Sequence, residues 1–243
     1  MTVQRDFGDV VPRWSPPFAP GPYVMDHWEG IIVELEVPRE QIEYMTPEPL
    51  TPAAHCRIYA VIVDACQTPH SLFYHEALIC HETDFMGHKG LHIPYIWTST
   101  DTAMLVGREL FGMPKLMCDH GKLQIFGNEV AGDLKRSGVT MMEAAVVIDR
   151  KIGADELPDF SSWMMVRHIP TPDPAYKARR QVVLAKCTDF KLFSAFEGRA
   201  WARMGYPSTS GLHRISTDRP VKGFYGKFGW VLGVGKILEE IEY

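Results

Sequence analysis

In GRELFGMPKLM, residues 107–117, one lysine follows a proline and lies among apolar residues. A surface lysine is protonated at neutral pH, whereas complete burial favours the neutral amine and lowers a lysine pKa by roughly 3–5 units. We expect the desolvation to come from Phe111, Met113, Leu116 and Met117. Pro114 restricts the backbone that carries Lys115. The stretch therefore predicts a reactive amine on a conformationally restricted backbone. The alternative is a lysine that only extends from an apolar strand to solvent.

Extended apolar segments dominate the rest of the chain and predict a mostly β fold. We expect strands at 29–37, 57–63, 91–98, 141–148, 163–169 and 181–186. Short helices are expected at 39–45, between Pro38 and Pro47, and at 102–111, ending at Gly112. Lys115 then begins a strand directly after a helix.

Composition excludes several classes of protein. The chain has 243 residues, 46% hydrophobic and 23% charged, which is enough for a full core, and we expect a single domain over residues 1–243. A net charge of −5 provides no basic field for nucleic acid, and no run of about 18 apolar residues could span a bilayer. Five cysteines without CxxC spacing, and no secretory signal, predict reduced thiols and a cytoplasmic location.

Several motifs together resemble the acetoacetate decarboxylase family. They are GREL with PK in 107–115, SPPFAPGPY at 15–23, PEPL at 47–50, DRPVK at 218–222 and the final run 230–243. The resemblance covers nearly the whole chain, which is identified as a divergent member. It implies an α+β, mostly β fold, namely a closed β-barrel wrapped by additional antiparallel strands with a few short helices. It also implies an assembly of identical subunits.

The resemblance assigns roles to two residues. Lys115 takes the place of the family's Schiff-base lysine, and Glu76, in the motif YHE at 74–76, takes the place of its catalytic glutamate. A neutral Lys115 amine would condense with a ketone, and the resulting iminium would accept the electrons of a breaking bond at the adjacent carbon. Glu76 would move the proton that the enamine needs. We expect no cofactor.

Two departures from the family pattern bear on the substrate. Leu116 stands where the family's decarboxylases carry a second lysine, and Trp28 aligns with an arginine thought to handle the substrate carboxylate. Tryptophan cannot pair with an anion, and a buried carboxylate without a partner is costly. The expected pocket is therefore apolar. The predicted substrate-binding residues are Trp28, His75, Tyr95, Trp97, Arg108, Phe111, Met113 and Leu116, with Arg108 and His75 as candidate partners of a carboxylate.

Three functions remain open. We favour aldolase-dehydratase or hydratase chemistry on a pyruvate-type keto acid, with an aldehyde as the second substrate, because apolar walls suit an aromatic or long-chain aldehyde. The alternative is a β-keto acid decarboxylase of the acetoacetate type. The second alternative is a non-catalytic barrel that binds an apolar ligand and keeps Lys115 for structure.

A dense run of histidines and acids could supply metal ligands. Its members are His75, Glu76, His81, Glu82, His88 and His92. The ligand types suit a metal, but no established zinc spacing occurs. We expect no metal site.

Overall fold

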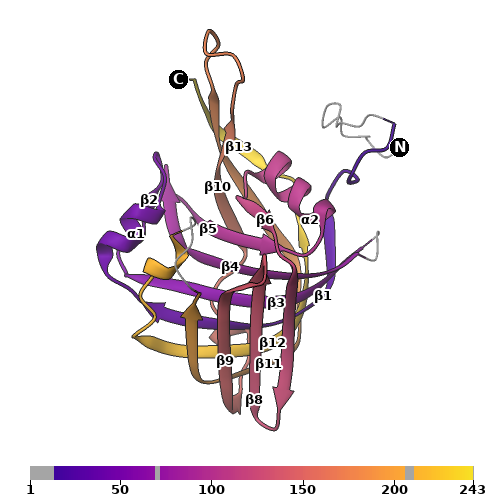
Figure 1. The fold of residues 1–243 in the computed structure, drawn as a ribbon, viewed down its shortest axis with the longest axis vertical. Coiled ribbons are helices and arrows are strands. Elements are labelled where there is room, and N and C mark those ends of the chain that lie inside the picture. The colour runs from indigo at the N-terminus through magenta and orange to yellow at the C-terminus, as the bar shows by residue number, and fades with distance from the viewer. Residues whose placement is uncertain (1–13, 69–71, 206–210, 243) are drawn as a thin grey trace.

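The computed structural model of the chain describes residues 14–68, 72–205 and 211–242, and Figure 1 shows a structure dominated by long strands. The strands are β1 (Tyr23–Glu36), β2 (Thr51–Pro52), β3 (Arg57–Thr68), β4 (Leu72–Phe85), β5 (His88–Thr98), β6 (Lys115–Met117), β7 (His120–Phe126), β8 (Glu129–Arg136), β9 (Val139–Lys151), β10 (Ser162–Ile169), β11 (Arg179–Met204), β12 (Pro220–Leu232) and β13 (Lys236–Glu242). The helical segments are α1 (Arg39–Met45), α2 (Asp101–Val106), the π-helical turn η1 (Gly107–Phe111) and the 3₁₀ turns η2 (Ala154–Glu156) and η3 (Leu212–Arg214).

Seven strands close into a barrel. Their order around the ring is β10-β5-β4-β3-β1-β12-β11, and the pairing of β10 with β11 completes it. Neighbours are antiparallel except where Trp163 of β10 pairs in parallel with Leu91 of β5. Closure pairs the edges that an open sheet would leave free, so the ring encloses an interior lined by inward-facing side chains.

The long strand β11 connects the barrel to an outer sheet. Its first part pairs with β10 and β13, its middle with β12, and residues 196–204 with β9. From β9 the sheet continues through β8 to β7. Figure 1 shows β8 and β9 running nearly vertical where β1, β3 and β4 run across. The outer sheet therefore covers one side of the barrel.

Two large cores lie on the opposite faces of the barrel wall. In β1, Trp28 and Ile32 belong to the core inside the ring, whereas Ile31 and Val33 belong to the core between the ring and the outer sheet. Successive residues of a strand point to opposite faces, so a strand covered on both sides needs consecutive apolar residues. The run Ile31–Val33 meets that need, and all three side chains are buried.

The mostly β fold and the barrel predicted from the sequence are confirmed. Each of the six expected strands is present, and helix α1 has the expected bounds. The expected helix at 102–111 is different: the α-helix ends at Val106 and the chain continues as a π-helical turn that stops at Gly112, whose φ is 77°. Strand β6 begins at Lys115, as expected. No helix in the described part of the chain is long and apolar enough to cross a membrane.

Candidate active site

A cavity of about 450 Å³ occupies the barrel interior. All seven ring strands contribute to its wall, together with the segment 154–161 and the Met113–Lys115 region. The wall is largely apolar and aromatic. Its lining residues are Met25, Trp28, Ile32, Val61, Tyr74, Glu76, Leu78, Ile93, Ile96, Met113, Lys115, Ala154, Asp155, Leu157, Pro158, Asp159, Phe160, Ser161, Trp163, Cys187, Phe190, Phe228, Trp230 and Leu232.

Lys115 and Glu76 form an ion pair in this cavity. Lys115 Nζ donates a hydrogen bond to Glu76 Oε2 at 2.5 Å, and the two residues are only 6% and 8% exposed. Strand β5 holds them together, because Glu76 pairs with Thr98 on one side of it and Lys115 pairs with Ile96 on the other. Lys115 Nζ also lies 5.7 Å from the centre of the Tyr74 ring, within the range of a cation–π contact.

The π-helical turn, with Gly107 at its start, leaves the space that the Lys115 side chain occupies. A Cβ at position 107 would lie 2.6 Å from Cδ and 2.7 Å from Cε of Lys115, so an alanine there would clash with the lysine chain. Arg108 Nη1 donates a hydrogen bond to the Lys115 carbonyl oxygen at 3.1 Å. The turn therefore fixes both the backbone and the aliphatic stem of Lys115. Sequence reasoning missed this role of Gly107, although the glycine belongs to the quoted motif.

The structure brings Lys115, Glu76, Trp28 and Met113 together in the cavity wall. Other expected site residues lie elsewhere. Phe111 is buried beside Tyr23, with ring centres 6.3 Å apart, and Arg108 and Leu116 are exposed. None of these three lines the cavity in the described part of the chain.

Tyr95, Trp97 and His75 also lie away from the cavity lining. The rings of Tyr95 and Trp97 stack at 6.2 Å, and both pack in the core between the barrel and the outer sheet. His75 Nδ1 lies 2.6 Å from Asp64 Oδ1 with both side chains partly exposed. The aromatic side chains of the cavity wall are the expected Trp28 together with residues that were not predicted to line it, namely Tyr74, Phe160, Trp163, Phe190, Phe228 and Trp230.

The histidine run is dispersed by the strands. His81 Nε2 lies 2.9 Å from Thr46 Oγ1, and His92 Nδ1 lies 3.2 Å from the Met164 carbonyl oxygen. The ring centres of His81 and His92 are 5.6 Å apart. Within the residues that the structure describes, no group of three or more His, Cys, Asp or Glu side chains is arranged to hold a metal ion.

The acetoacetate decarboxylase (ADC) family model matches residues 11–241. The chain belongs to the acetoacetate decarboxylase family. Among solved structures, an acetoacetate decarboxylase has a TM-score of 0.86 at 20% identity, covering 98% of this chain and 96% of that one. The acetoacetate decarboxylase of Legionella pneumophila has a TM-score of 0.85 at 18% identity, covering 98% and 94%.

A third structural neighbour is the enduracididine biosynthesis enzyme MppR, in complex with the condensation product of pyruvate and imidazole 4-carboxaldehyde. Its TM-score is 0.82 at 20% identity, with 96% of each chain covered. A sequence comparison with curated proteins gives no match. At these identities the neighbours establish the fold, and the family assignment rests on the match over residues 11–241.

Proposed function

We propose that this family member is a Schiff-base-forming lyase that acts on a small keto acid through Lys115. The observation that carries the proposal is the 2.5 Å contact between Lys115 Nζ and Glu76 Oε2 in an apolar cavity. Separated charges are costly in such surroundings, and a proton transfer from Lys115 to Glu76 removes both charges at once. The transfer leaves a free amine beside a carboxylic acid, which is the pair that imine formation requires.

The favoured reaction is an aldol condensation followed by loss of water. The Lys115 nitrogen adds to the keto carbon of a pyruvate-type acid, the Glu76 carboxylic acid gives its proton to the departing hydroxyl group, water leaves, and an iminium forms. The Glu76 carboxylate then removes a proton from the adjacent carbon, and the electron pair of that C–H bond forms the enamine. The enamine carbon attacks the aldehyde carbon, and the new alkoxide takes a proton. Loss of the hydroxyl group as water gives a conjugated iminium, which a further water molecule hydrolyses to release the product and Lys115.

A 2-keto acid suits the charges of this wall better than a 3-keto acid does. Its carboxylate is bonded directly to the carbon that becomes the iminium carbon, so the positive nitrogen lies next to the negative group. Trp28 lines the wall and offers no cation to a more distant carboxylate. The MppR complex with a pyruvate–aldehyde condensation product supports the same choice by analogy of fold.

Decarboxylation of a β-keto acid is the second candidate, because the apolar wall around Lys115 favours a step in which the carboxylate loses its charge. There the bond to the carboxyl carbon breaks, its electrons form the enamine, and Glu76 returns a proton to carbon.

Product analysis separates the candidates. The protein is incubated with pyruvate plus benzaldehyde, and separately with acetoacetate, and kcat/KM is measured for each. We expect a dehydrated condensation product in the first reaction at a higher kcat/KM than carbon dioxide release in the second. Efficient carbon dioxide release with no condensation product would establish the decarboxylase instead. No turnover of either, in a folded sample, would favour the ligand-binding barrel.

A further inference from the structure

We propose that Asp155 and Asp159 are specificity-determining residues at the cavity, which make the site accept uncharged or cationic aromatic aldehydes and reject aldehydes that carry a carboxylate. This inference rests on the proposed function, because it concerns the aldehyde that the Lys115 enamine attacks. Both aspartates line the cavity and are exposed, so their charges lie where the cavity meets solvent.

The cavity has room for more than the keto acid. Its volume of about 450 Å³ lies within the roughly 300–1,000 Å³ that is typical of sites for drug-sized ligands. A three-carbon acid fills only part of such a space. The remainder is sufficient for an aldehyde with a ring.

The aromatic part of the cavity wall suits a flat apolar group. The ring centres of Trp28 and Phe228 are 4.8 Å apart at an interplanar angle of 28°, and Trp230 lies 5.5 Å from Trp28. Phe190 extends this wall at 5.9 Å from Phe228. Aromatic rings prefer such offset or tilted packing, so an aryl aldehyde would continue an arrangement that the side chains already have.

The charges of the lining are unbalanced. Three carboxylates contribute to it, those of Glu76, Asp155 and Asp159, whereas Lys115 is the one basic side chain among the lining residues in the described ranges. Lys115 is paired with Glu76. The negative charges of the two aspartates are therefore uncompensated within the wall. A carboxylate on the aldehyde would meet repulsion and find no cation, which is how a site discriminates against a wrong partner.

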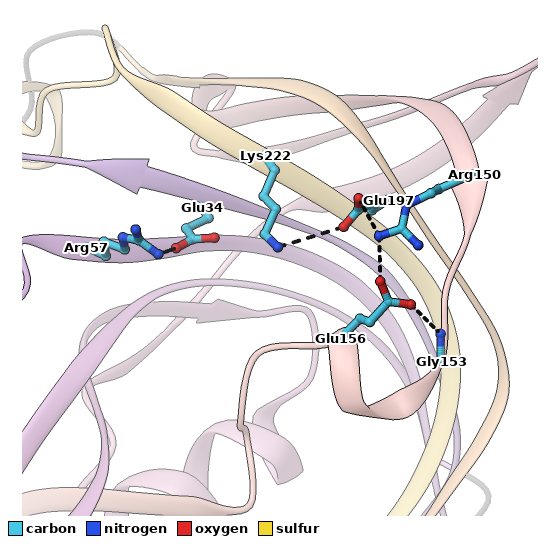
Figure 2. A network of polar contacts seen from close by, with 7 residues as sticks. All are labelled: Glu34, Arg57, Arg150, Gly153, Glu156, Glu197 and Lys222. Carbon is cyan, nitrogen blue, oxygen red and sulfur yellow. Dashed lines mark hydrogen bonds and ion pairs between the residues drawn. The ribbon is translucent and has the colours of Figure 1, made fainter.

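The segment that carries the aspartates is held in place independently of any ligand. Glu156, which follows Asp155, accepts a hydrogen bond from Arg150 Nη2 at 2.5 Å and one from the Gly153 backbone N–H at 3.2 Å. Figure 2 shows Arg150 continuing to Glu197, and Glu197 to Lys222, at 2.8 Å and 3.8 Å. These contacts tie turn η2, which carries Asp155, to β9, β11 and β12. Asp159 Oδ1 accepts a hydrogen bond from the Ser161 backbone N–H at 2.8 Å.

The two aspartates also repel the carboxylate of the keto acid, but this carboxylate ends next to the positive Lys115 nitrogen. A carboxylate on the aldehyde has no such cation as a partner. Comparison of aldehydes at one fixed, saturating concentration of pyruvate therefore isolates the effect of charge on the second substrate.

The test uses three benzaldehydes with a para methyl, carboxylate or trimethylammonium group, and measures kcat/KM for the condensation product. Because substituents also change the reactivity of the aldehyde, the decisive quantity is the carboxylate-to-methyl ratio in Asp155→Asn/Asp159→Asn divided by that in the wild type. We expect this quotient to be about five to ten, and the trimethylammonium-to-methyl ratio to fall in the same variant. In the wild type, the carboxylate-to-methyl ratio should rise in 0.5 M salt, because the Debye length is then only about 4 Å and the repulsion is screened.

Asp173→Asn is the matched control, because Asp173 is an exposed aspartate that does not line the cavity, and its ratios should equal those of the wild type. The single variants Asp155→Asn and Asp159→Asn should each give part of the effect. Unchanged ratios in the double variant, with pyruvate still trapped on Lys115 by borohydride, would overturn the inference and leave the proposed function standing. Absence of an adduct at Lys115 in the wild type with pyruvate, acetoacetate or any other small keto acid would overturn both.

Discussion

Lys115 and Glu76 meet across strand β5, 39 positions apart in the chain and 2.5 Å apart at their charged atoms. Neither residue is itself on β5; they come from its two neighbours, β6 and β4. A buried ion pair is weak evidence for stability, since the desolvation of two charges offsets most of their attraction. We therefore interpret the pair as serving the reaction rather than stability, and its two members can be tested separately.

Glu76→Gln keeps the shape of the side chain and removes its proton transfer. We expect turnover to fall by about 10²- to 10⁴-fold while imine formation stays detectable. Glu82→Gln is a suitable control, because Glu82 lies on the same strand and pairs with His55 outside the cavity. Steady-state kinetics and borohydride trapping are measured on both variants. Wild-type turnover in Glu76→Gln would remove this carboxylate from the mechanism.

Gly107→Ala adds one methyl group against the stem of Lys115. An alanine in place of a helical glycine usually stabilises a helix by about 0.5–1 kcal/mol, so a loss of activity here would not come from a weaker helical propensity. We expect slower adduct formation at Lys115 because its side chain must move. The rate of borohydride-dependent adduct formation is compared with thermal unfolding of the same sample. An unchanged rate would show that adduct formation does not depend on the space that Gly107 leaves beside the Lys115 side chain.

Leu116→Lys restores the second lysine of the family's decarboxylases. Leu116 is 37% exposed and lies outside the cavity lining among the described residues. The new ammonium group would therefore be screened by solvent, and kcat/KM for acetoacetate should change by less than about twofold. A large rise in carbon dioxide release would mean that the added cation reaches the Lys115 nitrogen.

The buried pair His81 and His92 predicts loss of stability in acid. Burial lowers the pKa of His81 to about 3, with the nearby His92 and His55 adding to the effect, and burial lowers the pKa of His92 to about 4. The unfolded chain binds these protons near pH 6.5, so this stability is fully present above that pH and is lost as pH falls towards 4.

The hydrogen bonds of His81 agree with this direction, whereas the hydrogen bond of His92 Nδ1 to the Met164 carbonyl oxygen opposes it and is outweighed by burial. Thr46 Oγ1 donates to the Ile42 carbonyl oxygen, so His81 Nε2 is the donor to Thr46. His81 Nδ1 has no partner within the described structure, and a proton there would be buried without an acceptor.

Urea unfolding at pH 7, 6 and 5 measures the loss. The two histidines together should contribute a decrease of up to about 2.7 kcal/mol per pH unit below pH 6. The exposed His88 provides the control variant, His88→Gln, which should keep the wild-type slope. A free energy of unfolding that is flat between pH 7 and 5 would contradict the assignment.

The parts of the candidate site that depend on local pattern could be predicted from the sequence. The proline and the apolar neighbours in 107–117 indicated Lys115, and the family resemblance indicated Glu76. Strand β6 begins at Lys115 because helical segments end at Gly112, and Gly112 has the left-handed conformation that favours glycine. The π-helical turn was not predicted, because an α-helix and a π-helix share the same periodic signal over five residues.

The cavity wall could not be predicted from local pattern. Trp163, Phe190, Phe228 and the segment 154–161 are distant in sequence and meet only because β10, β11 and β12 close the ring. Tyr95 and Trp97 were expected in this wall, but the register of β5 places them elsewhere. The pairing of β4 with β5 has a register irregularity between Ile79 and His81, and a shift of one residue exchanges the two faces of a strand. Ile96 consequently faces the cavity, and Tyr95 and Trp97 face the other core.

The most direct test of the account is covalent trapping at Lys115. The folded protein is incubated with pyruvate and borohydride, and the site of the adduct is determined by mass spectrometry of its peptides. We predict a reduced pyruvate adduct on Lys115 in the wild type, and none in Lys115→Arg, whose guanidinium stays protonated and cannot attack a carbonyl. Folded wild-type protein that gives no adduct at Lys115 with pyruvate, acetoacetate or any other small keto acid would contradict the central claim.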